Sequence, residues 1–266
     1  MPKVSKARTS QRKDPLQGTH KSASTSKTNG ASRPPTAEHP PNYLFHCLMI
    51  DSEDPMIQRM LSVPSTFTLE QMHEVLQVSF GWANSHLWQF KLHRIFSTEK
   101  EEEEDLGENG NMPLLTFVTD PEDRVSTHPW PEEDLKSASE WKLSDIFEND
   151  EYRSKVNLRY EYDFGDSWEH HITFLGIEDP GHRKALMPDA EYDIPVCFGG
   201  EGHPCAEDCG GAPGWEHLKE VLTKKSRDPE LKDWYKRYCA NGDPKGLDPY
   251  KWNIVKVNDR LAKLKA

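Results

Sequence analysis

Acid–base chemistry is the first function that the residue types suggest, and it centres on residues 157–177. Two alternating aromatic and β-branched runs flank Gly165-Asp166, a pattern typical of a β-hairpin. Asp163, Asp166 and His170 lie in or beside the turn. A carboxylate next to an imidazole raises the pKa of the ring and can orient it for proton transfer. These three side chains are therefore the candidate catalytic residues.

The strand register decides whether these groups meet. With a turn of two or four residues, Asp163 pairs with Trp168 and Glu161 pairs with His170, so that Glu161, Asp163 and His170 share one face of the hairpin. The alternative interpretation is purely structural: a cross-strand charge pair and an aspartate that closes the turn. Trp168 then belongs either to the core or to a ligand groove.

A second group of chemically active residues occupies a glycine-rich segment. Cys197, His203, Cys205 and Cys209 form the soft donor set of a closed zinc site. The Cys-x7-Cys and Cys-x3-Cys spacings match no common finger or ribbon pattern, so we expect no obligatory zinc and no other cofactor. These four residues remain the alternative metal ligands. A glycine-rich connector with buried thiols and a redox-sensitive surface are the other interpretations.

Charge separates the chain into two parts. The 266 residues carry a net charge of −12, but residues 1–40 hold eight Lys or Arg and only two acidic residues, which leaves −18 for the remainder. An acidic body opposes binding of duplex nucleic acid, whose affinity depends on neutralising phosphates. Nucleotide-dependent and serine-hydrolase chemistry also lose support, because the glycine-rich phosphate loops and Gly-x-Ser-x-Gly are absent.

The cellular setting follows from composition. The longest apolar run, Tyr43 to Ile50, is far below the roughly 20 residues of a membrane span, and no apolar signal region occurs in residues 1–40. Five cysteines, an odd number, suit a reducing compartment. We expect an intracellular, cytoplasmic protein without membrane contact. Nuclear entry through the basic tail is the alternative.

The pattern of polar and apolar residues predicts one folded domain, a disordered tail and a surface loop. Residues 1–41 are expected to be a disordered basic tail, and residues 99–111 an acidic surface loop. Residues 42–266 are expected to form a single α+β, roll-like domain in which helices pack on a mixed or antiparallel sheet. The other strands are expected at Tyr43–Ile50, Ile57–Val63, Leu87–Phe96 and Leu114–Thr119, and helices at 68–81, at 141–147 and through the last third of the chain.

Several segments together resemble one family. They are Thr68 to Gln77 with Gly81-Trp82 and Ser85-His86-Leu87; Tyr160-Glu-Tyr-Asp-Phe-Gly-Asp-Ser-Trp-Glu-His170; Gly199 to Gly211 with Gly214-Trp215; and Asp248-Pro-Tyr to Asn258. In order and content they resemble the plasmid pRiA4b ORF-3-like family, also labelled insertion-element passenger proteins, with the MM3350-like fold. The resemblance implies an α+β roll and supplies no reaction or catalytic residues. The long basic tail and the acidic insertion resemble a fungal-type member.

Two functions remain open. The first is a binding or adaptor module that recognises a small molecule or a protein through a groove lined by His86, Trp168, Glu207 and Asp208. The second is a metal-independent enzyme that acts on a small metabolite through Asp163, Asp166 and His170. Convergence of His86, Asp166, His170 and Asp208 on one concave pocket would favour the enzyme.

Overall fold

A computed structural model of the chain describes residues 39–96, 112–121, 134–223 and 228–265. All of them belong to the compact unit Pro35–Ala266. The expected acidic loop at 99–111 and almost all of the expected disordered tail at 1–41 lie outside the described residues, so both stay predictions. None of the helices in the described ranges is long and apolar enough to cross a bilayer.

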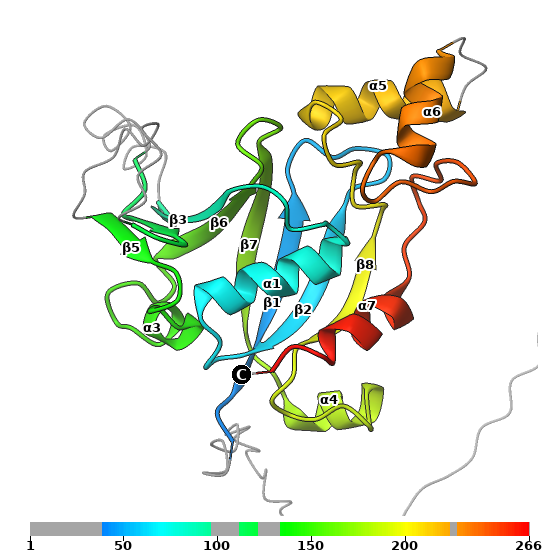
Figure 1. Cartoon of the computed structure of the whole chain (residues 1–266). Helices are drawn as coiled ribbons and strands as arrows, with labels where there is room; N and C mark the ends of the chain where they lie inside the picture. Colours follow the sequence, from blue (N-terminus) through cyan, green and yellow to red (C-terminus); the bar gives the residue numbers. More distant parts are fainter. Residues whose placement is uncertain (1–38, 97–111, 122–133, 224–227, 266) are drawn as a thin grey trace, which may run out of the picture. The chain divides into compact units, whose positions relative to one another are not determined.

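Eight strands form a single mixed sheet, which together with the helices confirms the predicted α+β fold (Figure 1). Its order is β5-β4-β3-β6-β7-β1-β2-β8, and neighbours are antiparallel except for the parallel pair β4 and β5. The strands are β1 (Asn42–Met49), β2 (Gln58–Pro64), β3 (Trp88–Arg94), β4 (Leu115–Val118), β5 (Leu135–Ser137), β6 (Val156–Tyr162), β7 (Trp168–Ile177) and β8 (Val196–Glu201).

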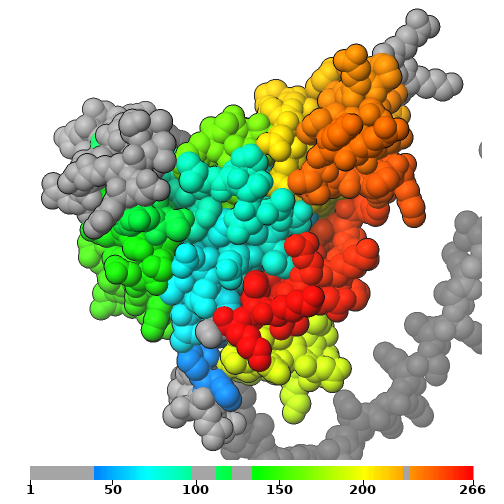
Figure 2. Space-filling model, in the orientation of Figure 1, coloured from blue at the N-terminus to red at the C-terminus, as the bar shows by residue number. Residues whose placement is uncertain are grey.

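Six helices in the described residues accompany the sheet. They are α1 (Leu69–Phe80), α3 (Leu143–Phe147), α4 (Pro180–Leu186), α5 (Gly211–Thr223), α6 (Pro229–Arg237) and α7 (Ile254–Leu261). Figures 1 and 2 show α1 and α7, in cyan and red, side by side across one face of the sheet. Helices α5 and α6 lie beyond one end of the strands, and α4 lies at the other (Figure 1).

Helix α1 has the ends that the sequence predicts. The Thr68 side chain accepts the Gln71 amide while the Gln71 side chain accepts the Thr68 amide, which is a complete capping box. Gly81 ends the helix in the left-handed conformation. The buried face of α1 includes Leu69, Met72 and Leu76, and it packs against inward-facing aromatic residues of the sheet.

The hairpin register corrects one prediction. Tyr162 lies opposite Trp168 and Tyr160 opposite His170, so the expected pairs Asp163 with Trp168 and Glu161 with His170 are wrong by one residue. The connection spans residues 163–167, which is neither two nor four residues long. Because side chains alternate between faces, this shift puts Glu161 on the face opposite His170. There it accepts hydrogen bonds from Gln89 and Lys91.

Strand β8 corrects a second prediction, because part of the expected glycine-rich connector is regular sheet. Cys197 lies within β8, which pairs with β2. Gly200 sits where two chains approach closely: an added Cβ would lie 2.6 Å from the Gln58 carbonyl oxygen and 2.9 Å from Arg59 Cδ. Glycine in this strand thus makes room for the buried arginine beside it.

Candidate functional site

Three connecting segments meet at the end of the sheet nearest α5. His86 comes from the segment between α1 and β3, Asp163 from the β6–β7 turn, and Asp208 from the segment between β8 and α5. His86 Nδ1 lies 3.6 Å from Asp163 Oδ2, and His86 Nε2 lies 3.2 Å from Asp208 Oδ1. We refer to these three side chains as the His86 cluster.

The β6–β7 turn fixes the position of Asp163. Its Oδ1 accepts the backbone amides of Gly165 at 3.0 Å and Asp166 at 3.4 Å, and its own amide donates to the Leu87 carbonyl at 2.9 Å. The turn is therefore tied to the segment that carries His86. With Oδ1 bound inside the turn, Oδ2 is the oxygen that faces the imidazole.

Glu207 links the segment between α1 and β3 to the end of β6 by two hydrogen bonds. It is almost fully buried, and it accepts hydrogen bonds from the Ala83 amide at 3.0 Å and from the Tyr162 hydroxyl at 2.8 Å. Burial and the neighbouring Glu207 carboxylate raise the pKa of Tyr162 to about 12. The phenol therefore stays protonated and donates a hydrogen bond to Glu207. Glu207 therefore holds the site together rather than lining an open groove.

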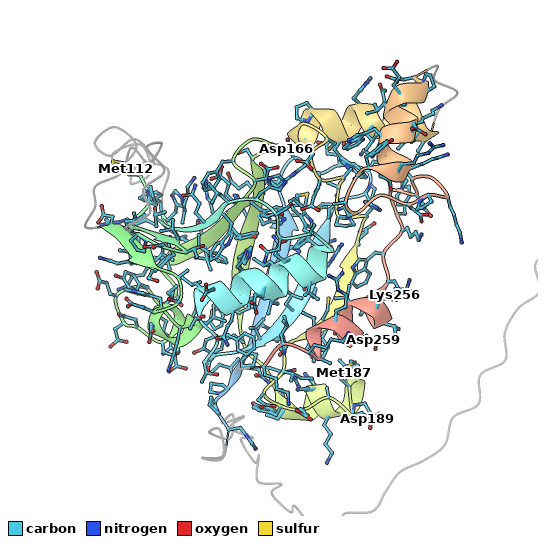
Figure 3. The ribbon with its side chains drawn as sticks, in the orientation of Figure 1. Met112, Asp166, Met187, Asp189, Lys256 and Asp259 are labelled. Carbon is cyan, nitrogen blue, oxygen red and sulfur yellow. The ribbon has the colours of Figure 1, made fainter. Side chains whose placement is uncertain are left out.

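Asp166 closes the turn against Gly210 and Gly211 at the start of α5. Its Oδ2 accepts the Gly210 amide at 3.1 Å. A Cβ added to Gly211 would lie 2.5 Å from the Asp166 carbonyl oxygen, so the turn packs directly on glycine backbone. Figure 3 labels Asp166 at this end of the sheet, whereas Met187 and Asp189 after α4 lie at the opposite end.

His170 and Trp168 lie in the core behind this site. The His170 ring is 1% exposed and meets the Phe80 ring edge-on at 4.6 Å. Burial lowers its pKa to about 4, so the ring is neutral at pH 7. Trp168 is 2% exposed and packs at right angles to Trp82. Of the sequence candidates, His86, Asp163, Asp166, Glu207 and Asp208 come together, and His170 and Trp168 do not join them.

The cysteine and histidine candidates each turn to a different partner. Cys197 Sγ donates to Gly199 O, Cys205 Sγ contacts Met49 Sδ at 3.3 Å, and Cys209 Sγ lies 3.8 Å from Gly211 O. The His203 ring stacks on Trp215. Burial raises the pKa of Cys197 to about 11 and that of Cys209 to about 12, which disfavours the thiolates that zinc needs. In the described ranges, only the His86 cluster brings three such ligand atoms within 4.8 Å of one another.

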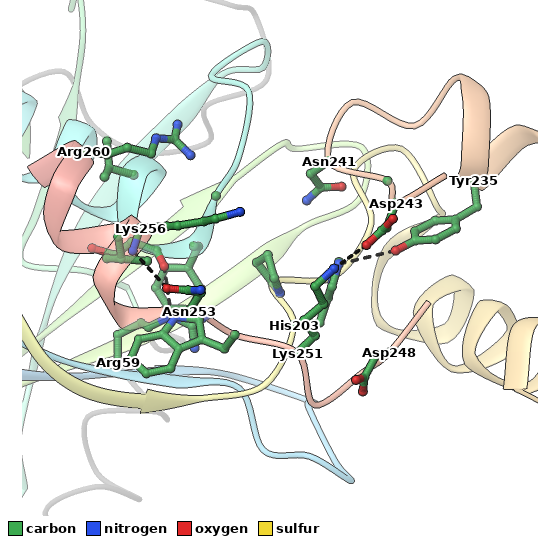
Figure 4. Close-up of a pocket in the computed structure, with 18 of the residues that line it drawn as sticks. Arg59, His203, Tyr235, Asn241, Asp243, Asp248, Lys251, Asn253, Lys256 and Arg260 are labelled. Carbon is green, nitrogen blue, oxygen red and sulfur yellow. Dashed lines mark hydrogen bonds and ion pairs between the residues drawn. The ribbon is translucent and has the colours of Figure 1, made fainter. Parts of the chain in front are cut away.

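A cavity of about 360 Å³ lies beside these segments, and the sequence reasoning missed it (Figure 4). It is bounded by the C-terminal end of α1, by α7 and by the segment around residues 241–253. Its apolar wall includes Val78, Phe80, Pro204, Trp252 and Val257; its polar lining includes Arg59, Ser79, His203, Tyr235, Asn241, Asp243, Asp248, Lys251, Asn253, Lys256 and Arg260.

Arg59 forms the floor of the cavity as a fully buried cation. Its guanidinium lies between the rings of Phe80 and Trp252, 4.9 Å from each centroid. Its N–H groups donate to backbone carbonyls of residues 58, 79, 201 and 202, and within the described part of the chain it has no acidic partner. One sequence signal points here: Arg59 occupies the inward position of a strand whose other inward residues are Leu61 and Val63.

Asn241 links the cavity to the three-segment site. It lines the cavity, its Nδ2 donates to the Cys205 carbonyl at 2.8 Å, and its Oδ1 accepts the Glu207 amide at 3.1 Å. One short stretch, residues 203–208, therefore contributes His203 to the cavity and Asp208 to the His86 cluster. The two sites are neighbours on this stretch.

Comparison with known proteins agrees with this architecture. The family model for the plasmid pRiA4b ORF-3-like protein matches residues 45–253. The uncharacterised protein y4hQ of Sinorhizobium fredii (strain NBRC 101917 / NGR234) is 26% identical over 198 residues, which is 73% of this chain and 79% of that protein. The crystal structure of MM3350, a protein of unknown function from Methanosarcina mazei Go1, has a TM-score of 0.53 at 24% identity and covers 80% of this chain and 96% of its own.

The fold and these segments define an α+β protein with a polar site at one end of a mixed sheet. The chain belongs to the plasmid pRiA4b ORF-3-like family, which confirms the family resemblance of its sequence. The relatives named here are bacterial and archaeal, so a fungal-type member stays a prediction.

Proposed function

We propose that this chain is a small-molecule-binding protein whose ligand carries an anionic group and occupies the cavity beside α7. One observation carries the proposal: the cavity of about 360 Å³ joins an apolar wall to the cationic side chains of Lys256 and Arg260, which have no acidic partner among the described residues. This volume lies within the range of roughly 300–1,000 Å³ that is usual for small-molecule sites. A mostly apolar lining with a few converging polar groups is also usual for them.

Charge favours an anion. Lys256 and Arg260 lie one turn apart on α7 and line the cavity, and neither has an ion pair with another described residue. Lys251, by contrast, is bound to Asp243. The buried Arg59 adds a fourth positive group, and Asp248 adds one negative group. A lining with more basic than acidic side chains is notable in this chain, because its net charge is −12.

Polar atoms without partners support a ligand at the same place. Among the described residues, Ser79 Oγ, His203 Nδ1 and Trp252 Nε1 are buried and make no hydrogen bond. Buried polar atoms normally have partners, and these three would gain one from a bound molecule or water at the cavity. Burial lowers the pKa of His203 to about 4, and the neutral ring leaves Nδ1 available to donate or accept one hydrogen bond.

The second candidate function, an acid–base enzyme, has narrower support. Among the sequence candidates, the carboxylate–imidazole contacts are His86 with Asp163 and His86 with Asp208, and neither contact includes His170. His170, the base that the sequence reasoning favoured, is enclosed by aromatic rings and is 1% exposed, so a substrate has no route to it in this conformation. Binding is therefore the function that the geometry favours.

Native mass spectrometry of the gently purified full chain tests the proposal. We expect an added mass of a small molecule, released on denaturation and identified as bearing a phosphate or carboxylate group. The double variant Lys256→Glu/Arg260→Glu should lose it. Lys184→Glu/Arg94→Glu changes the net charge equally at exposed positions outside the cavity and should retain it. Equal loss or equal retention in both double variants would contradict the proposed site.

A further inference from the structure

We propose that the His86 cluster is a binding site for a divalent transition-metal ion, with one imidazole and two carboxylates as protein ligands. This site is separate from the cavity, and its metal is not required by the proposed small-molecule binding. One ligand atom from each of His86, Asp163 and Asp208 lies within 4.8 Å of the others. Atoms that share one ion with bonds of about 2.0–2.2 Å lie about 3 Å apart. Because Asp163 faces Nδ1 and Asp208 faces Nε2, binding one ion requires the His86 ring or one carboxylate to rotate toward the other two ligands.

The imidazole has a hydrogen-bonding deficit that a cation would remove. His86 Nε2 is shielded from solvent and makes no hydrogen bond, although Asp208 Oδ1 is 3.2 Å away, because the geometry is not that of a hydrogen bond. A shielded ring nitrogen without a hydrogen bond is open to a further partner, and an ion between it and Asp208 is one such partner. The nitrogen lone pair of a neutral imidazole is a common ligand of divalent metals.

The charge around the ring is also unbalanced. Asp163 and Asp208 face the His86 ring, and Asp166 and Glu207 lie on the same two segments, the hairpin turn and the segment before α5. Within the part of the chain that the structure describes, none of the four is ion-paired with lysine or arginine. A single imidazole, even when protonated, offsets only one of these charges, so the site attracts a further cation.

The surroundings hold the ligands as metal sites generally require. Backbone amides bind Asp163 Oδ1 and leave Oδ2 facing His86, and the His86 ring packs edge-on against Tyr162 at 5.7 Å. Such supporting contacts orient ligands and tune affinity. Asp208 is 59% exposed, so the ion would lie at the surface with coordination positions left for water or a ligand. Imidazole with carboxylates suits ions such as Mn²⁺, Fe²⁺ and Zn²⁺.

Mn²⁺ is the probe, because the five cysteines compete for Zn²⁺. The full chain is treated with chelator, dialysed and titrated with Mn²⁺ while electron paramagnetic resonance reports free ion. We expect one saturable site with a dissociation constant below about 100 µM. His86→Ala and Asp208→Asn should each weaken it at least tenfold. Asp163→Asn keeps the Oδ1 acceptor that the turn uses but removes the charge, and it should weaken binding without unfolding.

A matched surface pair gives the control. His171 Nε2 lies 3.1 Å from Glu169 Oε1 on β7, so His171→Ala removes a histidine that also touches a carboxylate but lies outside the cluster. This variant should bind Mn²⁺ like the parent chain. Circular dichroism and thermal melting of each variant separate loss of ligand from loss of fold. Absence of saturable binding, or equal weakening by His171→Ala and His86→Ala, would overturn the proposal.

Discussion

The Tyr162 hydroxyl donates a hydrogen bond to Glu207 Oε1 at 2.8 Å, and it accepts the Ser85 amide at 3.0 Å. One phenol thus joins the hairpin to both other segments of the site. Because Glu207 is buried, the pair lies where an unpaired carboxylate is costly. At this end of the sheet the contact therefore adds to the pairing of Tyr162 with Trp88 and Trp168 in the neighbouring strands.

Tyr162→Phe should lower the free energy of unfolding by about 1–3 kcal/mol, because it leaves the Glu207 carboxylate and the Ser85 amide each short of a partner. Urea titration measures the change. Tyr250→Phe removes an exposed hydroxyl bonded to Asp54 and should cost less than about 0.5 kcal/mol. Equal effects of the two variants would show that the Tyr162 contact does not hold the site.

The buried histidines make stability depend on pH. Burial lowers the pKa of His73, His93, His170 and His203 from 6.5 to about 4. Between these values the unfolded chain binds more protons than the folded chain, so stability falls as pH drops from about 6.5 to 4.

His170→Phe should flatten that slope by up to about 1.4 kcal/mol per pH unit, the value for one proton, in urea titrations at pH 7, 6 and 5. A slope unchanged by His170→Phe would mean that His170 binds its proton at the same pH in the folded chain as in the unfolded chain, which would contradict the lowered pKa.

Trp168→Ala should cost about 3–5 kcal/mol, because its side chain is 2% exposed and packs against Trp82. Tyr238→Ala removes a ring that is 71% exposed and should stay within about 0.5 kcal/mol of the parent chain. Differential scanning calorimetry compares the two. A cost below about 1 kcal/mol for Trp168→Ala would place the indole on a surface.

Neighbouring glycines in β8 should behave differently. Gly200→Ala forces a Cβ to 2.6 Å from a backbone oxygen and should cost about 1–3 kcal/mol, whereas at Gly199 the nearest atom is 3.9 Å away and alanine should be nearly neutral. Thermal melting of both variants distinguishes a required close approach from a general preference for glycine. Similar melting temperatures would argue against the tight packing of Arg59 below the cavity.

The predictable parts of the fold are those with local causes. The helix expected at 68–81 and the strand expected at Tyr43–Ile50 depend on neighbouring residues, and both are present, as Leu69–Phe80 and Asn42–Met49. The predicted hairpin register was wrong because the length of a turn cannot be read from residue types. A shift of one residue moves every side chain of a strand to the other face of the sheet. The site residues His86, Asp163 and Asp208 could be named but not joined, since three distant segments bring them together.

The cavity shows a different limit. Its walls come from β2, α1, α7, His203 and Pro204, and the segment around 241–253, so no local pattern marks it. Two residues carry a local sign of the cavity: Arg59, at an inward strand position, and Gly200, which lies opposite it. Neither sign can be interpreted before the pairing of β2 with β8 is known.

The Trp252 indole gives the most direct test of small-molecule binding in the cavity. Its Nε1–H is without a partner in the described structure, and the ring lies on Arg59. In ¹H–¹⁵N spectra of the full chain, with the indole signal assigned through Trp252→Phe, titration with inorganic pyrophosphate and with citrate should shift this signal saturably. The shift should disappear in Lys256→Glu/Arg260→Glu and persist in Lys184→Glu/Arg94→Glu. An indole signal that neither anion moves, or that moves equally in both double variants, would contradict an anion-binding cavity.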